Sequence, residues 1–217
     1  MKRRELLELI EGGENLLCEF KRKFSTHEKI TREMIAFANT KGGVLLIGVD
    51  DDKEIVGVES EKSEAELIKD VASNYCVPPV EYEIEYMDVN GKEVVIVQIA
   101  ESKIKPHRLQ DYKNEFDINN AVVCIRVNDK SVMASKEMVR IFRAETNELK
   151  LKKYAPGPIE KSVFDFLTEQ ERISVKELSK LANISERRAS RTLVKMVRAR
   201  LLNIHTKDNG EEYFTAI

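Results

Sequence analysis

Along the first 150 residues, hydrophobic positions change between the period of a helix and that of a strand. Apolar residues spaced three or four apart are typical of an amphipathic helix. Ser25 and Thr26 can cap one such segment, and Gly12-Gly13 can end another. The pattern predicts helices over residues 3–11, in the segment after Thr26, over 63–77 and over 134–150.

Strand-like segments lie between these helices. Asn90-Gly91 is the dipeptide preferred in two-residue hairpin turns, and it joins two predicted strands within residues 80–100. Further strands are predicted around Glu19–Lys21, at 44–49, at 55–58 as the hairpin partner of 44–49, and at 121–127. Because helices and hairpins interleave, the expected fold is α/β, with an α+β-like mixed sheet and flanking helices.

A basic stretch followed by Pro156-Gly157-Pro158 marks a domain boundary. We expect an α/β domain over 1–150, a linker over 151–158 and a second domain over 159–217. The second domain is predicted to hold helices over 159–168, 175–182 and 186–200, followed by a hairpin that turns at Asp208-Asn209-Gly210. Three helices and a hairpin in about 60 residues are typical of a small winged helix-turn-helix domain.

Composition restricts the partners and the compartment. The chain has 36 Lys and Arg against 38 Asp and Glu, a net charge of -2 that argues against a uniformly basic nucleic-acid coat. Residues 1–155 carry -4 and residues 156–217 carry +2. The chain has three separated cysteines, no secretory signal pattern and no apolar run of about 20 residues. These features predict a cytoplasmic protein with reduced thiols and no membrane partner.

Positive charge gathers on the last predicted helix. Arg187, Arg191, Lys195 and Arg198 follow one another at steps of four, four and three, so they share one face. In a DNA-binding helix-turn-helix this helix enters the major groove. The pattern predicts nucleic-acid binding, with double-stranded DNA as the partner and no cofactor required. Dimerisation or protein docking is the alternative role for such a domain.

Residues near the ends of this helix extend the predicted interface. Ser185 and Arg188 at its start are candidates for contacts with base edges or phosphates. Lys207, at the turn of the hairpin, could reach an adjacent groove. A homodimer would place two such surfaces on paired half-sites.

Gly42 and Gly43 lie beside Lys41, which suggests a phosphate-binding loop. In a Walker loop, however, the glycines follow a strand and precede a helix, so that phosphate meets the positive helix N-terminus. Here they follow a helix and precede a strand, at the negative end of the helix dipole. We therefore expect a helix C-cap, and ATP is not an expected cofactor.

Several segments carry a family resemblance. ENLLCEFKRKF, MIAFANTKGGVLLIGVDDDKEIVGV, KPHRL and AVVCIRVNDKSVMASKEMVRIF resemble the Schlafen AlbA-like domain family in order, spacing and composition, over roughly residues 5–145. Microbial members are commonly paired with a winged helix and described as DNA-binding or transcriptional regulators, so the resemblance implies a regulator. It also implies that KPHRL lies near the sheet edge, where we interpret His107 as a loop histidine rather than a catalytic base.

The resemblance implies a second function. Vertebrate members carry two glutamates and an aspartate that cleave structured RNA, and the matching positions here are Glu14, Glu19 and Asp50. Mg²⁺ or Mn²⁺ held by these carboxylates would suit phosphodiester hydrolysis, and Lys21 could contact a phosphate. The alternative function is thus a metal-dependent endoribonuclease. Equally, Glu19 and Asp50 could be structural and pair with Lys21 or Arg126.

Overall fold

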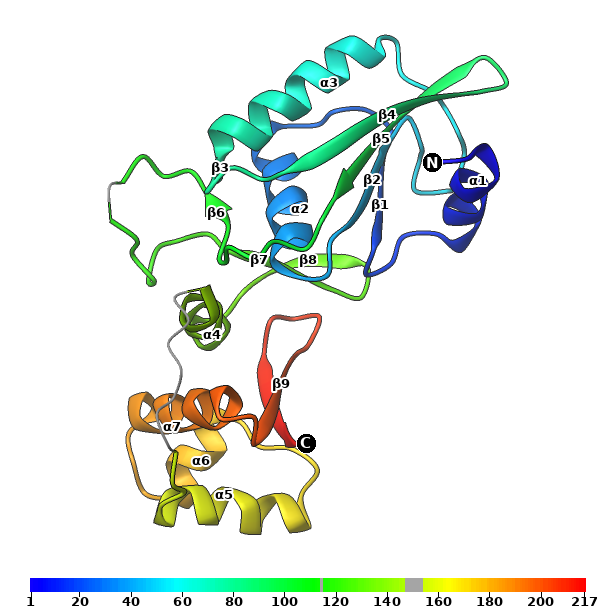
Figure 1. The fold of residues 1–217 in the computed structure, drawn as a ribbon. Coiled ribbons are helices and arrows are strands. Elements are labelled where there is room, and N and C mark those ends of the chain that lie inside the picture. Colours follow the sequence, from blue (N-terminus) through cyan, green and yellow to red (C-terminus); the bar gives the residue numbers. More distant parts are fainter. Residues whose placement is uncertain (114, 147–153) are drawn as a thin grey trace. The chain divides into compact units, whose positions relative to one another are not determined.

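A computed structural model describes residues 1–113, 115–146 and 154–217 (Figure 1). The chain forms two compact units, Met1–Met133 and Ala134–Ile217. Within the described residues, no helix is both long and apolar enough to cross a membrane.

The helices predicted in the first unit are confirmed. α1 spans Arg3–Gly12, and α2 spans His27–Asn39 with the Thr26 hydroxyl accepting a hydrogen bond from the Lys29 backbone N–H. α3 spans Glu61–Asp70 and continues as a π-helical turn over Val71–Tyr75. α2 and α3 begin directly after Thr26 and Ser60, whose hydroxyls accept hydrogen bonds from backbone N–H groups of the first turn.

The central sheet is mixed, as predicted, with strand order β1-β2-β5-β4. β1 (Cys18–Lys21) runs parallel to β2 (Gly43–Ile47), whereas β2 pairs antiparallel with β5 (Lys92–Ile99). β4 (Tyr82–Val89) forms the predicted hairpin with β5, and Asn90 and Gly91 both have positive φ at its turn. The helix between β1 and β2 supplies the crossover that a parallel pair requires.

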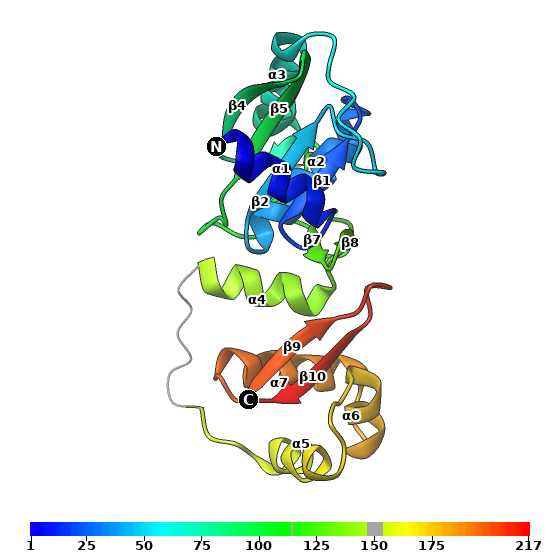
Figure 2. The same ribbon diagram turned by 90° about the vertical axis from the view of Figure 1, so that its right-hand side faces the viewer.

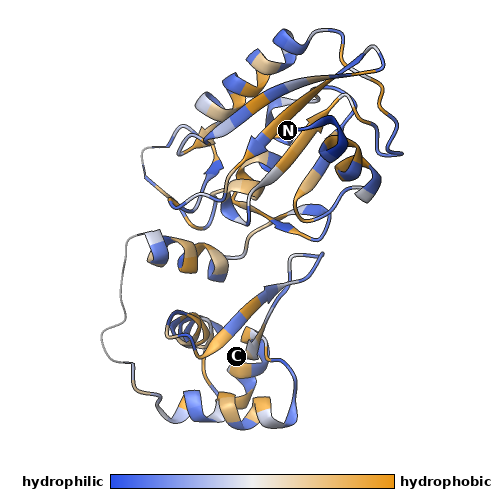
Figure 3. Ribbon diagram, turned by 45° about the vertical axis from the view of Figure 1, so that its right-hand side comes forward, coloured by the Kyte–Doolittle hydropathy of each residue, from blue (hydrophilic) through white to orange (hydrophobic). Residues whose placement is uncertain are grey.

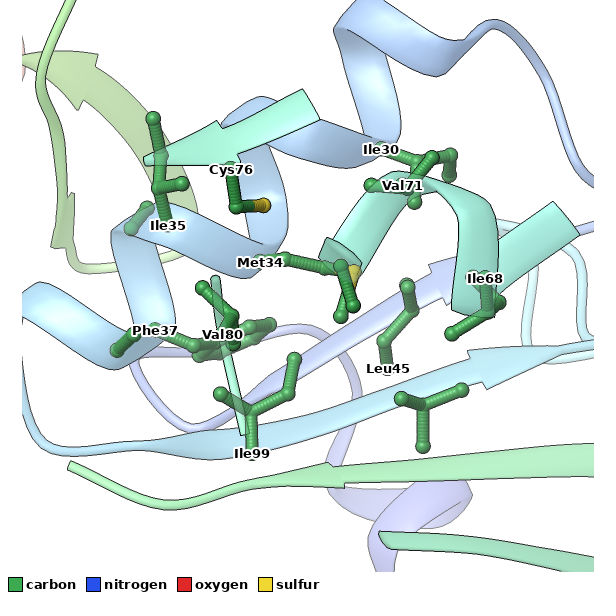
Figure 4. Packing of buried hydrophobic residues seen from close by; sticks show 14 of the residues in the cluster. Ile30, Met34, Ile35, Phe37, Leu45, Ile68, Val71, Cys76, Val80 and Ile99 are labelled. Atoms are coloured by element: carbon green, nitrogen blue, oxygen red, sulfur yellow. The ribbon is translucent and has the colours of Figure 1, made fainter. Parts of the chain in front are cut away.

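Helices cover both faces of this sheet (Figures 1 and 2). Alternate side chains of β2 and β5 point to opposite faces, so Leu45 and Val97 pack with α2 and α3, whereas Leu46 and Ile96 pack with α1. Figure 3 shows these central strands as hydrophobic along most of their length. Figure 4 shows the larger cluster, in which Met34 of α2 lies among buried side chains of the sheet and α3. Burial on both faces explains the continuous apolar runs in the sequence.

The predicted hairpin between 44–49 and 55–58 forms only as a single antiparallel bridge, between Val49 and Ile55. Both edges of β2 are already occupied, by β1 and β5. Residues 55–58 instead fold across the end of β2, where the N–H groups of Val56 and Gly57 both donate to the Gly48 carbonyl at 2.9 Å. Hydrophobic spacing alone does not distinguish this short crossing segment from a strand.

Two short strand pairs complete the first unit. β3 (Cys76–Val77) pairs with β6 (Arg108–Leu109), and β7 (Cys124–Val127) pairs with β8 (Lys130–Met133). β7 confirms the strand predicted at 121–127, whereas β6 and β8 were not predicted. β3 corrects the end of the helix predicted over 63–77, because Cys76 and Val77 are extended and pair with β6. Both strands of the β7–β8 hairpin contact α2.

The described residues of the second unit, 134–146 and 154–217, form four helices and a hairpin. The bounds are α4 Lys136–Thr146, α5 Pro158–Glu169, α6 Val175–Leu181, α7 Glu186–Arg198, β9 Leu202–Thr206 and β10 Glu212–Ala216. These elements match the predicted helices and the C-terminal hairpin, and Ser174 and Ser185 cap α6 and α7 as expected. Residues 147–150 of the predicted helix and 151–153 of the predicted linker lie outside the described residues.

Helix α4 belongs to the second unit, whereas the expected division at residue 150 places it in the first. It packs against α7, and the Arg140 guanidinium donates to the Ser190 hydroxyl at 2.8 Å. Glu137 of α4 accepts a hydrogen bond from the same hydroxyl and pairs with Arg140 at 3.0 Å. The contacts between α4 and α7 therefore decide to which unit α4 belongs. The position of the proline-rich segment after α4 in the sequence does not.

Candidate nucleic-acid interface

Helix α7 has one buried face and one charged face. The Ser185 hydroxyl accepts a hydrogen bond from the Arg188 N–H at 3.3 Å, which fixes the start of the helix. Ala189, Leu193 and Met196 are fully buried in the core of the second unit. Because these apolar residues fix the rotation of the helix, its opposite side, with Arg187, Arg191 and Lys195, faces solvent.

The predicted basic residues of α7 lie on this outer face. Arg187, Arg188, Arg191 and Lys195 are exposed together with Ser185, and all five line one groove of about 760 Å³. The opposite wall of the groove comes from Pro158, Ile159 and Glu160 at the start of α5. The structure thus brings five of the seven predicted contact residues together.

The other two predicted contacts lie elsewhere. Arg198 is partly buried near the end of α7 and does not line the groove. Lys207 lies at the hairpin turn, where its ammonium pairs with Glu211 at 3.1 Å. Lys207 and Glu211 line a different pocket, beside α6. The hairpin turn is therefore separate from the basic groove.

Glu160 is the one acidic residue that lines the groove. Its carboxylate accepts hydrogen bonds from the Tyr154 hydroxyl at 2.7 Å and from the Gly157 N–H at 3.0 Å. Partial burial would raise the pKa of Glu160, but these hydrogen bonds and the nearby Lys195 lower it below its usual value. Its negative charge is thus held at the start of α5, while four basic side chains dominate the remaining lining.

The carboxylates implied by the family resemblance lie in the first unit, on separate structural elements. Glu14 precedes β1, Glu19 lies within β1 and Asp50 follows β2. Glu14 accepts a hydrogen bond from the Phe20 N–H at 2.9 Å. Burial raises the pKa of Glu14, and the charge of nearby Glu19 raises it further. Asp50 pairs with Arg22 at 2.7 Å instead of with Lys21 or Arg126.

Glu19 is held by a buried arginine. The Arg126 side chain is 0 % exposed and donates to Glu19 at 2.9 Å and to Glu33 at 3.1 Å. It also donates to the Asn15 carbonyl at 2.8 Å. Lys21, the predicted phosphate contact, forms an ion pair with Glu19. The structural alternative for Glu19, with Lys21 and Arg126 as its partners, is therefore the arrangement observed.

The observed partners of Glu19 and Asp50 are cationic side chains. Within residues 1–113, 115–146 and 154–217, no group of three or more His, Cys, Asp and Glu side chains is placed to hold a metal ion. A divalent metal requires several oxygen ligands directed at one point, whereas Glu19 and Asp50 are directed at cationic side chains. The metal role of Glu14, Glu19 and Asp50 stays a prediction.

The glycines beside Lys41 form a turn after α2. The Gly42 N–H donates to the Phe37 carbonyl at 2.9 Å, and Gly42 has a φ of +71°. A Cβ atom on Gly42 would lie 2.5 Å from the Ile99 carbonyl oxygen, and one on Gly43 would lie 2.4 Å from the Phe37 ring. Close packing leaves no room for a side chain at either position, which agrees with the C-cap interpretation. Protein atoms fill the space that a phosphate would need beside these glycines.

His107 lies in a loop directly before β6, as expected, but it is buried, with 3 % of its surface exposed. Asn39 of α2 holds the surrounding chain, since its side chain accepts from the His107 N–H at 2.7 Å and donates to the His107 carbonyl at 2.8 Å. The sequence signal that could have located it is Asn39, a polar residue directly after the apolar run MIAFA at the end of α2.

The chain belongs to the Schlafen, AlbA_2 family, whose model matches residues 14–135. This match contains Glu14, Glu19 and Asp50 and ends within two residues of the first unit. Helices α5–α7 and the C-terminal hairpin lie beyond it.

Two solved structures are similar to parts of the chain. One is the DIP2311 protein from Corynebacterium diphtheriae, with 17% identity and a TM-score of 0.45; the match covers 65% of this chain and 29% of that one. The chain therefore spans under a third of that relative. The other is the N-terminal domain of a protein from Nitrosomonas europaea described as related to the ATP-dependent DNA helicase RecG. It is 25% identical with a TM-score of 0.41, and the match covers 52% of this chain and 83% of that one.

Proposed function

We propose that the protein binds nucleic acid through the groove between α5 and α7, and that it acts as a DNA-binding transcriptional regulator. The observation that carries this proposal is the gathering of Arg187, Arg188, Arg191 and Lys195 on the exposed face of one helix. Phosphates of a duplex supply the complementary charge, and arginine donors fit phosphate oxygens and guanine edges alike.

The arrangement of the second unit supports the proposal. Helices α5, α6 and α7 followed by the β9–β10 hairpin have the order of a winged helix, in which the last helix lies in the major groove. The net charge of residues 156–217 is +2 in a chain of net charge -2, so attraction to phosphate is local to this unit. The family and the RecG-related neighbour also agree with a role on nucleic acid.

A salt-dependent binding experiment tests the proposal. Anisotropy of a fluorescent duplex DNA is measured with the full chain at several salt concentrations, in parallel with a structured RNA of similar length. Replacement of Arg188 and Arg191 by Ala should weaken binding and reduce the slope of log K against log salt by about 1.8, or about 0.9 for each lost phosphate contact. A preference for duplex DNA over RNA is expected.

The matched control removes the same charge elsewhere. Lys62 and Lys69 are exposed on α3 of the first unit, and their double replacement by Ala should leave the salt slope unchanged. Equal losses in the two double variants would show that binding depends on total charge alone, and unchanged binding of the Arg188 and Arg191 variant would overturn the proposal. Sedimentation with and without DNA tests the expected homodimer.

A further inference from the structure

Strand β4 forms an edge of the central sheet. It is the end strand in the order β1-β2-β5-β4, and among the described residues it pairs only with β5, along its full length of eight residues (Figure 1). An edge strand presents a row of backbone N–H and C=O groups with which another chain can pair. An edge of this length can bind an extended peptide as an added strand. The nucleic-acid interface proposed above uses no residue of β4.

The turn at Asn90-Gly91 determines which backbone groups of β4 face outward. In a two-residue hairpin turn the flanking residues, here Val89 and Lys92, form a hydrogen-bonded pair. Counting back along β4, every second residue exchanges hydrogen bonds with β5, and the residues between them direct their N–H and C=O groups away from the sheet. The outward-facing residues are Tyr82, Ile84, Tyr86 and Asp88. In the part of the chain that the structure describes, no other backbone group bonds to these four.

Three of these residues form an apolar row on one face of the sheet. Tyr82 and Ile84 pack against the cluster that α2 and α3 form with the sheet. Tyr86 follows them on the same face and leaves 46 % of its surface exposed. A strand added beside β4 would place its own alternate side chains next to this row. Apolar side chains at those positions would cover the exposed part of Tyr86, and this burial favours binding.

The charge of β4 is entirely acidic. The strand contains Glu83, Glu85 and Asp88 and no Lys or Arg. Glu85 pairs with the Met1 amino group, whereas Glu83 and Asp88 are exposed and form no ion pair within the described residues. Two copies of β4 aligned edge to edge would bring these like charges together, which disfavours pairing between copies of this chain. The same charges attract a basic segment.

We propose that β4 binds an extended, basic segment of a partner protein as an added strand of the central sheet. Backbone groups of the segment pair with the outward groups of β4. Every second residue of the segment is apolar and packs beside Tyr82, Ile84 and Tyr86. The residues between them are Lys or Arg and lie on the face that carries Glu83 and Glu85. The partner is thus recognised by the alternation of basic and apolar residues, and the proposal does not depend on nucleic-acid binding.

The acetylated and amidated heptapeptide KVKVKVK is a probe with this alternation. Full-length protein labelled with ¹⁵N is titrated with it at low salt, and the backbone amides are followed by NMR. We expect a dissociation constant on the order of 1 mM, with amide shifts confined to β4 and its neighbours in β5. At about ten times this constant, hydrogen exchange of the Ile84 and Tyr86 amides should slow about tenfold, because only the bound state protects them. The Leu45 amide, in the central strand β2, serves as the internal reference.

The peptide KKKKVVV has the same composition and charge without the alternation, and it should bind about three- to tenfold more weakly. Glu83→Gln should weaken binding of KVKVKVK about two- to fivefold, because it removes one exposed ion pair. The control Glu171→Gln removes an exposed carboxylate of the second unit and should not change binding.

Three results would overturn the proposal: equal affinity for the two peptides, shifts confined to other elements, or no protection of the Ile84 and Tyr86 amides by KVKVKVK up to 10 mM (about ten times the expected constant). Protection of these two amides that rises with protein concentration alone would also overturn it, because a second copy of the chain would then occupy the edge.

Discussion

Glu212 is a buried carboxylate whose ionisation should make the second unit pH-sensitive. It lies in β10 opposite Thr206 of β9, and neither of its carboxylate oxygens has a hydrogen-bond partner among the described residues. Burial raises the pKa of Glu212 to about 7, the charge of Glu137 in α4 adds to this effect, and the nearby Ser135 hydroxyl partly opposes it. Glu212→Gln keeps the shape of the side chain and removes the charge.

The size of the change in the free energy of unfolding follows from the difference between the pKa values of Glu212 in the folded and unfolded protein. The folded pKa of about 7 exceeds the ordinary glutamate value of 4.5, and each pKa unit corresponds to about 1.4 kcal/mol. The folded protein keeps a proton on Glu212 that the unfolded chain loses, so the free energy of unfolding falls as the pH rises from about 4.5 to about 7. Above that window, ionised Glu212 costs about 3 kcal/mol, whereas below it the cost disappears.

Urea denaturation at pH 4, 6 and 8, followed by circular dichroism, measures this dependence. Glu212→Gln should be about as stable as the parent at pH 4 and more stable by up to about 3 kcal/mol at pH 8. Hydrogen exchange of peptides from residues 202–217 assigns the gain to the hairpin. Glu211→Gln is the control, because Glu211 is exposed and its pKa is lowered by Asn209 and Lys207. A gain independent of pH, or the same gain in Glu211→Gln, would refute the reasoning.

Three further predictions concern the first unit. Arg126→Met should lower the free energy of unfolding by about 3–5 kcal/mol, because it leaves Glu19 buried without its partner. The control Arg22→Ala breaks a more exposed ion pair, with Asp50. It should lower the free energy of unfolding by at most about 1 kcal/mol in the same urea titration. Gly42→Ala should lower the thermal midpoint by several degrees, since its Cβ would meet a backbone oxygen and its φ is positive; a midpoint equal to that of the parent would contradict the packing argument. With Mn²⁺ and a structured RNA, we expect no cleavage that depends on Glu14; cleavage lost in Glu14→Gln would instead support the nuclease alternative.

The sequence predicted the elements whose signals are local. Thr26, Ser174 and Ser185 cap helices where expected, and Asn90-Gly91 forms its hairpin turn. Each of these signals acts within a few residues of the chain, so the neighbouring sequence suffices to predict it.

Pairings between distant segments were harder to predict. The sequence of the strand at 44–49 does not indicate which segments pair with its two edges. Residues near 19 and near 96 occupy them. Without that information, the neighbouring segment 55–58 was the nearest candidate for a hairpin partner. The same reasoning applies to the candidate sites. Helical spacing placed the arginines of α7 on one face, but the wall supplied by α5 depends on how the two helices pack. The buried position of His107 depends on contacts with Asn39 and Pro78, which are 68 and 29 residues away.

The membership of α4 in the second unit has an evolutionary consequence. Recombination preserves a fold when it exchanges a segment whose internal contacts stay intact. The segment that meets this condition begins at Ala134, because Glu137 and Arg140 would otherwise be separated from Ser190. The family match also ends at 135. A relative that carries a different C-terminal module should therefore diverge from this chain before α4, and not at the prolines around residue 157.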